Sequence, residues 1–505
     1  MNVITLDFET YYNSKEGYTL KKMTVEEYIR SPLFQAIGVG VKLNNGETEW
    51  ASGTHRQLRA FLNKFPFEES LLVCQNTAFD GFILSEHFSI YAKWYADTML
   101  MAKGLHGFDA PASLAALAQL YGVGNKGNEV VEADGLRRED FSDMHLSVYG
   151  DYCVNDVELT HSIFNKMVCN GFPRKEMQLI DLTLRMFIYP RLVLDTKLLH
   201  DHLANVRLKK EELLASAQCA STTLMCNTDL ADMLRSYGVE PPTKVSPRTG
   251  KTIYAFAKTD EGIKALMEHE NPNVQALIAA RLGVKSTLEE TRTERLIGIA
   301  GRGLLPIPLK YYGARTGRWS AEGAINMQNM PRGSTIKKAI VAPDGYVIIG
   351  SDLSNIELRV GLWLAGQWDK LELLRNGVDL YKDFASSVFN VPYDEVTTDQ
   401  RFVGKTSQLS LIYGTGAKKL RSQIKILSGT DIGEDLAMSV VDIYRQEYVQ
   451  VKEAWYAGDA VLKAIRRDAL TTYEPNGVMK LHVHGKKGVQ LPSGSVSYTH
   501  LRAHE

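Results

Sequence analysis

The chain has 505 residues, of which 44% are hydrophobic and 23% charged. This composition is typical of globular proteins, and the length is enough for about three domains. The five cysteines form no CxxC pair, which argues against a zinc site or a disulfide framework. Since no apolar run approaches membrane-spanning length and Asp7 excludes an ordinary signal peptide, we expect a soluble intracellular protein without a membrane partner.

Basic residues are concentrated in two stretches although the net charge is only −1. Residues 301–340 contain seven Lys or Arg and one acidic residue, and residues 401–430 contain six basic residues and no acidic one. This pattern favours a groove that binds phosphates, although two solvated basic faces would produce it as well.

The order of elements predicts three parts. Residues 1–175 mix strand-like runs such as VITLDFET with helical runs, which indicates an α/β domain. Residues 176–300 are charged and helical in pattern, and short strands return between longer helices over 301–495.

Three segments of the first part carry acidic residues at spacings that suggest one site. A strand over VITLDFET places Asp7 and Glu9 on the same face. The segment CQNTAFDGFIL carries Asp80, and DYCVNDVELT carries Tyr152 and Asp156 on one side of a helix. Acidic alternation alone is typical of an exposed edge strand, but three such segments in this order favour a shared site.

Four converging carboxylates repel one another unless they bind cations, and their hard oxygen ligands favour Mg²⁺ or Mn²⁺. Two such ions, about 4 Å apart, can activate a water and stabilise the leaving oxygen of a phosphodiester, and Tyr152 could orient that water. The set resembles the three motifs of the proofreading 3′–5′ exonucleases that use Asp-Glu-Asp-Asp plus Tyr. The resemblance implies an RNase H-like domain that removes nucleotides from a single-stranded 3′ end.

The segment GYVIIGSDLSNIELRVGLWLAG contains a second candidate site. Its apolar run, Val347–Ile349, predicts a buried strand that ends at Asp352, followed by a helix from about Ser354 that carries Glu357. A carboxylate at a strand end can bind a metal together with a backbone carbonyl, here that of Leu353. An Asp at this position is also frequently a helix cap.

A helix with a distinctive stripe is predicted in TTDQRFVGKTSQLSLIYGTG. Thr397 and Gln400 fit a capping box at its start, and Gly414 fits its end. The stripe consists of residues spaced by four: Arg401, Lys405, Leu409 and Tyr413. Two cations followed by an apolar side chain and a ring would match a triphosphate, a sugar and a base, but a solvated basic face with Leu and Tyr in the core fits as well.

DLSNIELR and RxxxKxxxLxxxYG resemble the two central motifs of family A DNA polymerases, and RTGRWSAEGAINMQNMP resembles that family's TGR…QN segment. The resemblance runs from about residue 178 to about residue 494. It implies an α/β protein in which the exonuclease domain precedes a polymerase right hand, with a helical thumb over 176–300 and fingers and an incomplete palm over 301–495.

The resemblance also implies a role for each matching residue. Asp352 would bind two catalytic Mg²⁺ ions, and Glu357 would disfavour a 2′-hydroxyl, so deoxynucleotides are the expected substrates. The residues expected to contact the incoming nucleotide are Glu357, Tyr381, Arg401, Lys405, Leu409 and Tyr413. Those expected to contact the minor groove of the primer–template are Arg318, Gln328 and Asn329.

Three positions depart from the family pattern. Leu409 replaces the usual aromatic residue, and Tyr381 stands where His is common. The third departure is that the sequence contains no His-Asp-Glu segment, which would supply the second metal-binding aspartate of the palm. Two alternatives therefore stay open: a 3′–5′ exonuclease whose later region only holds DNA, and a primer–template binding protein with incomplete sites. The complete four-carboxylate set argues against the second.

The last ten residues, VSYTHLRAHE, match one reading frame of a transposon-end adapter used to prepare sequencing libraries. We therefore expect that 496–505 do not belong to the protein and pack against nothing.

Because the exonuclease motifs begin at residue 7, we expect no 5′ nuclease before them. This organisation looks most like a bacteriophage replicative polymerase, a monomer in the cytoplasm of an infected bacterium. Its expected partners are primer–template DNA, deoxynucleoside triphosphates, a helicase–primase and a processivity factor. A cellular repair polymerase is the alternative, whereas Glu357 and the proofreading motifs argue against a single-subunit RNA polymerase.

Overall fold

The computed structural model forms two compact units, Met1–Ile348 and Ile349–Glu505, and each is described by itself. The described residues are 1–127, 133–217, 219–246, 249–257, 260–267, 269–285, 288–323, 325–331 and 333–466, with short strands at 472–473, 481–484, 488–490 and 496–498. No helix among them is both long and apolar enough to cross a membrane. The expected boundaries at 175 and 300 fall inside the first unit and stay predictions.

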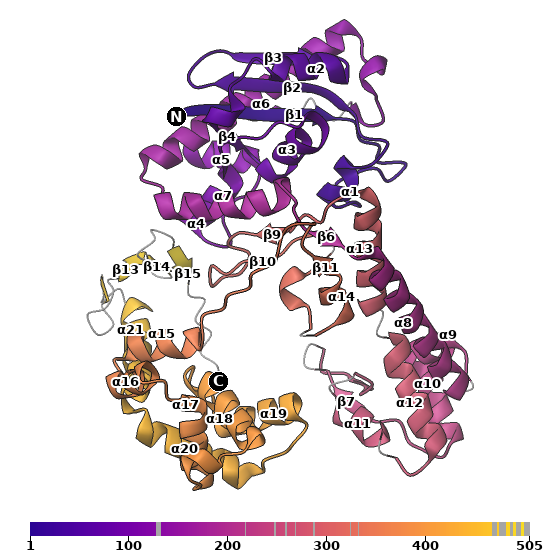
Figure 1. The fold of residues 1–505 in the computed structure, drawn as a ribbon, viewed down its shortest axis with the longest axis vertical. Helices are drawn as coiled ribbons and strands as arrows, with labels where there is room; N and C mark the ends of the chain where they lie inside the picture. The colour runs from indigo at the N-terminus through magenta and orange to yellow at the C-terminus, as the bar shows by residue number, and fades with distance from the viewer. Residues whose placement is uncertain are drawn as a thin grey trace. The chain divides into compact units, whose positions relative to one another are not determined.

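The first unit contains a mixed five-stranded sheet of order β3-β2-β1-β4-β5 (Figure 1). The strands are β1 (Asn2–Thr10), β2 (Ala36–Leu43), β3 (Thr48–Ser52), β4 (Ser70–Cys74) and β5 (Trp94–Asp97). β1 pairs antiparallel with β2 and parallel with β4. The carboxylates of VITLDFET therefore lie on the central strand, and an exposed edge strand is excluded.

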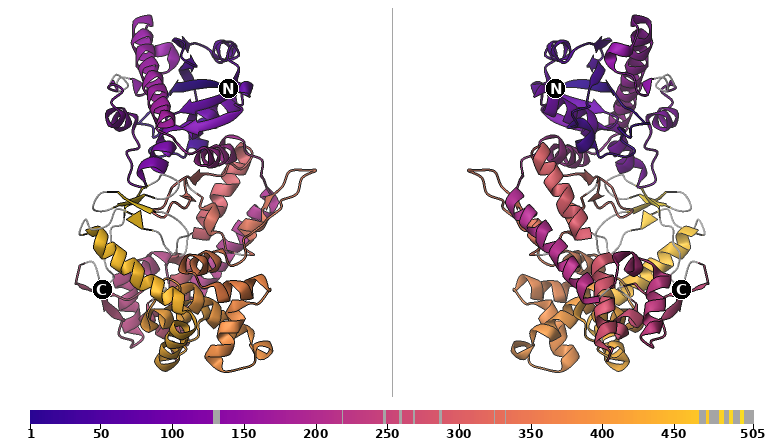
Figure 2. Two further views of the ribbon diagram at one scale, coloured as in Figure 1. Left: turned by 90° about the vertical axis from the view of Figure 1, so that its left-hand side faces the viewer. Right: turned by 90° about the vertical axis from the view of Figure 1, so that its right-hand side faces the viewer.

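Helix α6 (Asp143–Cys169) packs along the sheet, in contact with β1, β2 and β3 (Figure 2). Glycine allows this close approach, because a Cβ on Gly40 of β2 would lie 3.0 Å from the Sγ of Cys153. On β4 and β5 pack α3 (Thr77–Ile83), α4 (Thr98–His106) and α7 (Arg174–Ile188). Other elements of this region are α1 (Val25–Ile29), α2 (His55–Leu62), η1 (Phe67–Glu69), η2 (Leu84–Phe88), α5 (Leu114–Tyr121) and η4 (Arg138–Asp140).

Long helices follow the sheet, in agreement with the helical pattern over 176–300. α8 (Thr196–Ala217) contacts both α12 (Pro272–Lys285) and α13 (Leu288–Arg302). Smaller elements of this region are α9 (Ser221–Met225), α10 (Asn227–Ser236), β7 (Thr243–Val245), β8 (Thr252–Tyr254) and α11 (Glu261–Met267). The unit is completed by β6 (Val193–Leu194), β9 (Leu309–Lys310), β10 (Ser320–Ala321), η5 (Met327–Asn329), α14 (Thr335–Lys338) and β11 (Ile340–Val341).

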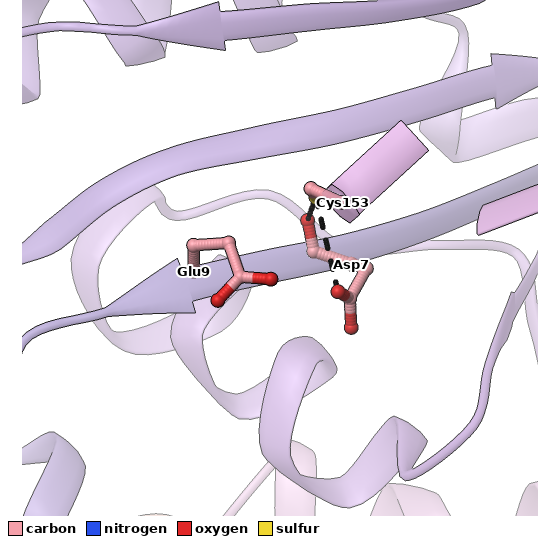
Figure 3. Close-up of side chains that lie close together, drawn as sticks. All are labelled: Asp7, Glu9 and Cys153. Atoms are coloured by element: carbon pink, nitrogen blue, oxygen red, sulfur yellow. Dashed lines mark hydrogen bonds between the residues drawn. The ribbon is translucent and has the colours of Figure 1, made fainter. Parts of the chain in front are cut away.

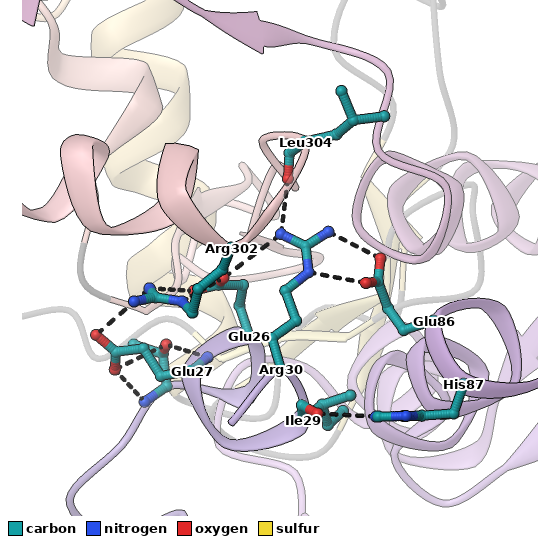
Figure 4. Close-up of polar contacts among 9 residues, drawn as sticks. Glu26, Glu27, Ile29, Arg30, Glu86, His87, Arg302 and Leu304 are labelled. Atoms are coloured by element: carbon teal, nitrogen blue, oxygen red, sulfur yellow. Dashed lines mark hydrogen bonds and ion pairs between the residues drawn. The ribbon is translucent and has the colours of Figure 1, made fainter. Parts of the chain in front are cut away.

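A cluster of ion pairs joins the sheet region to the end of α13 (Figure 4). Arg30 donates to both oxygens of Glu86, at 2.8 and 2.9 Å, and to the carbonyl of Leu304 at 2.8 Å. Arg302 donates to both carboxylate oxygens of Glu26, at 2.8 and 2.9 Å. Since two-pronged arginine–carboxylate pairs fix direction as well as distance, the cluster sets the angle at which α13 meets α1.

The second unit is mostly helical. Its helices are α15 (Ile356–Ala365), α16 (Trp368–Arg375), α17 (Leu380–Phe389), η6 (Tyr393–Glu395), α18 (Thr398–Leu411), α19 (Ala417–Ser428), α20 (Glu434–Glu447) and α21 (Val449–Arg466). α18 begins with the predicted capping box of Thr397 and Gln400, and Gly414 follows its end with φ +76°. Gly404 brings α18 against α17, since a Cβ there would lie only 2.2 Å from the carbonyl oxygen of Tyr381.

The buried strand predicted over Val347–Ile349 is wrong. Val347 and Ile349 are 81% and 87% exposed, and no strand is assigned over 345–353. The physical reason is that a strand needs a neighbour for its backbone hydrogen bonds, and none of the described strands pairs with this segment. The following helix, α15, begins at Ile356, two residues after the predicted start.

A small sheet lies near the end of the second unit, in the order β12 (Thr472–Tyr473), β13 (Leu481–His484), β14 (Gly488–Gln490) and β15 (Val496–Tyr498). Ser497 lies opposite Val489. The expectation that 496–505 pack against nothing is therefore wrong for Val496–Tyr498, because a β-branched and aromatic run can add to an open hairpin edge. Residues 499–505 lie outside the described part, and the adapter origin stays a prediction.

Candidate functional site

Asp7 and Glu9 project from the same face of the central strand β1 (Figure 3). The Sγ of Cys153, on α6, donates to the backbone carbonyl of Asp7 at 3.4 Å and lies 3.8 Å from its Oδ2. Ligand atoms of Asp7, Glu9 and Cys153 all lie within 4.8 Å of one another. The structure therefore brings a strand and a helix together around two carboxylates and a thiol.

Asp80 reaches the same strand from α3. Its Oδ1 accepts a hydrogen bond from the backbone N–H of Phe8 at 3.0 Å, and its side chain is buried. Because Phe8 lies between Asp7 and Glu9 in the chain, this bond holds the third carboxylate beside the first two.

Tyr152 and Asp156 lie one turn apart on α6, as their spacing predicted. Both are buried, and the tyrosine hydroxyl hydrogen-bonds to the carboxylate. A lysine from the loop after α5 also reaches this pair: the Nζ of Lys126 donates to Oδ2 of Asp156 at 2.5 Å and lies 5.1 Å from the centre of the Tyr152 ring. The four predicted carboxylates and the tyrosine thus converge on one place.

Burial and mutual repulsion disfavour ionisation of Asp7, Glu9 and Asp80 and so raise their pKa values. Burial, and then the charge of Asp156, raise the pKa of Asp7 to about 7. Burial, followed by the charge of Asp7, also raises the pKa of Glu9 and of Asp80 well above the usual range. A divalent cation would relieve both the burial cost and the repulsion, and the carboxylate oxygens are donors that fit Mg²⁺ or Mn²⁺.

Three residues of this cluster were not singled out in the sequence. Tyr149 hydrogen-bonds to Glu9, and Cys153 contacts Asp7. Their positions on α6, three to four residues apart and in step with Asp156, are the signal that would have identified them. Lys126 carries no such signal, because it lies in a loop, distant in sequence from every other member of the cluster.

The predicted polymerase carboxylates are open to solvent. Asp352 and Leu353 lie in the irregular segment before α15, and Glu357 lies in the first turn of that helix; all three are exposed. The hydroxyl of Tyr413 donates to Oε2 of Glu357 at 3.4 Å. This contact brings two of the six predicted nucleotide-binding residues together.

The four residues of the stripe on and after α18 differ in exposure. Tyr413 is 68% exposed and Lys405 is exposed, so the alternative with the tyrosine in the core is excluded. Leu409 is partly buried against the core of the second unit. The Nε of Arg401 donates to Oδ2 of Asp379 at 2.6 Å, and its guanidinium lies 5.6 Å from the ring centre of Tyr381, which is only 4% exposed.

The predicted primer–template residues lie in the first unit. Arg318, Gln328 and Asn329 are all exposed. The side-chain amide of Gln328 donates to the carbonyl of Trp319 at 3.2 Å, so it lies next to the chain at Arg318. The carbonyl of Asn329 accepts from Arg292 of α13 at 3.3 Å. These residues and those around Asp352 belong to different units.

Comparison with known proteins gives one consistent family. The model of DNA polymerase family A matches residues 197–474, more than half of the chain. DNA polymerase I of Pseudomonas aeruginosa is 33% identical over 189 residues, which cover 36% of this chain and 20% of that protein. The DNA polymerase of Bacillus phage SP02 is 25% identical over 388 residues, which cover 68% of this chain and 56% of the phage protein. The chain thus spans only a fifth to about half of these relatives' length.

A solved structure has the same fold. It is the POL domain of Pol1 from M. smegmatis in complex with DNA primer-template and dNTP, with a TM-score of 0.64 at 18% identity. The match covers 94% of this chain and 76% of that domain. With the family model over more than half of its length and this mixed α/β fold, the chain belongs to the family A DNA polymerases.

Proposed function

We propose that this chain is a DNA-directed DNA polymerase with a proofreading 3′–5′ exonuclease in its first 175 residues. The observation that carries the exonuclease is the convergence of Asp7, Glu9, Asp80 and Asp156 around the central strand of a mixed sheet. That strand order supports an RNase H-like domain. Family membership supports the polymerase.

In the proposed exonuclease, the four carboxylates would hold two Mg²⁺ or Mn²⁺ ions, which would supply activation of a water and stabilisation of the leaving 3′ oxygen. Tyr152 orients the attacking water through its hydroxyl, which Asp156 holds in place. Burial of Glu9 and Asp80 would strengthen their attraction for these cations, since water screens buried charges little.

In the proposed polymerase, Arg401 and Lys405 bind the triphosphate of the incoming nucleotide, and Glu357 excludes a 2′-hydroxyl. Asp379 and the ring of Tyr381 hold the guanidinium of Arg401 on one side. Asp352 with the carbonyl of Leu353 would ligate Mg²⁺ there. Arg318, Gln328 and Asn329 contact the primer–template.

A role in bacteriophage replication is the finer part of the proposal. It is supported by the phage polymerase, which aligns with 68% of this chain. In that role the protein works as a monomer in the infected cytoplasm, with a helicase–primase and a processivity factor.

The test uses one labelled primer, alone and annealed to a template, with Mg²⁺ and deoxynucleotides. Wild type should shorten the single strand, Asp7→Ala should not, and Asp352→Ala should lose extension but keep shortening. The proposal would be contradicted if both variants kept both activities.

A second candidate function is a 3′–5′ exonuclease that binds primer–template without extending it. It is favoured by the exposure of Asp352 in a segment without strand structure. In the same assay this candidate predicts shortening by wild type with no extension, together with retained primer–template binding.

A further inference from the structure

Lys126 places a positive charge inside the carboxylate cluster. Its ammonium lies 2.5 Å from Asp156, over the ring of Tyr152. Burial and the neighbouring carboxylates raise the pKa of both Asp7 and Glu9, and the charge of Lys126 offsets part of that rise. The side chain is 29% exposed, so its end reaches the cluster while part of it stays in contact with solvent. Lys126 is thus within reach of both the buried acids and an arriving substrate.

The loop that carries Lys126 is attached to α6 without it. The side-chain amide of Asn155 donates to the carbonyl of Asn125 at 3.2 Å, and the Nζ of Lys166 donates to the carbonyl of Tyr121 at 2.6 Å. The first bond holds the loop at the residue before Lys126 and the second holds the end of α5, so the loop is attached to α6 independently of the contact between Lys126 and Asp156.

A cation at this position has two opposite effects. It stabilises the ionised carboxylates while no metal is bound, and it competes with a divalent ion for the same oxygen of Asp156. When a divalent ion takes that oxygen, the lysine is free to turn to another anion, and the phosphodiester of a bound 3′ end is the anion that the proposed site would receive. The lysine stem has four flexible carbons, which allow such a move.

We propose that Lys126 is a catalytic residue of the exonuclease. Its ammonium group pairs with Asp156 in the metal-free protein and pairs instead with the scissile phosphate when metal and DNA bind. The inference rests on the proposed exonuclease function. It predicts a combination that a structural residue would not show: without the lysine the site binds divalent metal more tightly, yet degrades DNA more slowly.

The variants Lys126→Met and Lys126→Gln remove the charge and keep most of the side chain, and Lys126→Arg keeps the charge. Lys166→Met is the matched control, because it removes a lysine that lies outside the cluster and holds the end of α5, where the same loop begins. Mn²⁺ affinity is measured by calorimetry without DNA, and degradation of a labelled single-stranded oligonucleotide is measured at saturating Mg²⁺. Thermal melts identify variants that fail to fold.

For both neutral variants we expect about 3- to 10-fold tighter Mn²⁺ binding and about 30-fold slower degradation. Lys126→Arg should recover part of the rate, and Lys166→Met should match wild type in both measurements. Unchanged or weaker Mn²⁺ binding, or degradation within twofold of wild type, would overturn the inference. Failure of the proposed exonuclease function would give a different result. In that case Asp7→Ala would degrade DNA like wild type, and the Mn²⁺ affinities would still test whether Lys126 opposes metal binding.

Discussion

The two candidate carboxylate sites of this molecule differ in how their backbone is held. Asp7 lies on a strand with partners on both sides, and a helix covers it. Asp352 lies in an exposed segment that pairs with no described strand. Two motifs of similar specificity therefore lead to a buried carboxylate cluster in one case and to exposed carboxylates in the other. Strand pairing, more than the motif itself, decides whether carboxylates converge.

The predicted nucleotide-binding stripe, Arg401, Lys405, Leu409 and Tyr413, is intermediate between these two sites. Arg401 and Lys405 lie on a capped helix that packs tightly on α17 through Gly404. Their relative positions are fixed by the helix, whatever the state of the segment around Asp352. The following experiments test whether this ranking of formed and open sites holds in solution.

The largest effect is expected from loss of a carboxylate in the formed site. Asp7→Ala or Asp156→Ala should slow metal-dependent degradation of single-stranded DNA by roughly a thousandfold or more, because one metal ligand is worth about 4 kcal/mol of transition-state stabilisation. Both variants should stay folded, since the change also relieves carboxylate repulsion. A labelled-oligonucleotide assay and thermal melts measure the two properties, and degradation at the wild-type rate would refute the metal assignment.

Loss of Arg401 should have the next largest effect. Arg401→Ala should weaken binding of a fluorescent deoxynucleoside triphosphate by about 10- to 100-fold, because a hydrogen bond between charged partners contributes about 1.5–3 kcal/mol. Fluorescence anisotropy measures the affinity. Arg421→Ala on α19 is the control, since that arginine pairs with Asp431 and has no predicted role in nucleotide binding. Equal weakening by both variants would show that the effect is nonspecific.

The metal-free stability of the formed site should depend on pH. Burial and Asp156 raise the pKa of Asp7 to about 7 from 3.8, so the native protein keeps a proton that the unfolded chain releases. The free energy of unfolding should therefore fall as the pH rises from about 4 to about 7. Asp7→Asn cannot lose that proton and should be more stable than wild type at pH 8 by about 1–3 kcal/mol, but not at pH 4.

Urea denaturation in EDTA at both pH values measures this difference. Added Mn²⁺ should raise the stability of wild type at pH 8 more than that of Asp7→Asn, because the cation takes the place of the proton. Equal stability of the two proteins at pH 8 without metal would show that the carboxylates are not buried together.

The smallest effect is expected at Leu409. A branched aliphatic side chain cannot stack beside the ribose as a flat ring does, and such contacts are worth about 0.5–1.5 kcal/mol. In a full-length version that includes the missing palm segment, Leu409→Phe should therefore change the ratio of normal to 3′-deoxynucleotide incorporation by a few-fold. Steady-state competition between the two nucleotides measures the ratio, and an unchanged ratio would show that residue 409 does not contact the sugar.

Local patterns predicted the elements that depend on local physics. Alternation in VITLDFET predicted β1, the four-residue spacing predicted the shared face of Tyr152 and Asp156, and the capping box predicted the start of α18. The errors arose where the outcome depends on distant partners. The apolar run at Val347 has the composition of a strand but lacks a neighbour among the described strands.

Residues that enter a site from a distant loop were also beyond local patterns. Lys126 is 30 residues from Asp156 in sequence, and no periodicity connects them. The strand at Val496–Tyr498 is a second example, because it forms by pairing with the edge of β14. In each case the missing information is a tertiary contact, which a single sequence does not contain.

The close packing of α6 on β2 has a consequence for mutational tolerance. A methyl group at residue 40 would lie 3.0 Å from Cys153 and 3.2 Å from Val157, so even alanine must displace the helix by a few tenths of an ångström. Because that helix also carries Tyr152 and Asp156, a variant at this buried glycine should lower the proposed exonuclease activity although every proposed metal ligand is still in the sequence. A mutational survey restricted to the proposed ligands and Tyr152 would therefore overlook residue 40, whose contribution is the space it leaves for the helix.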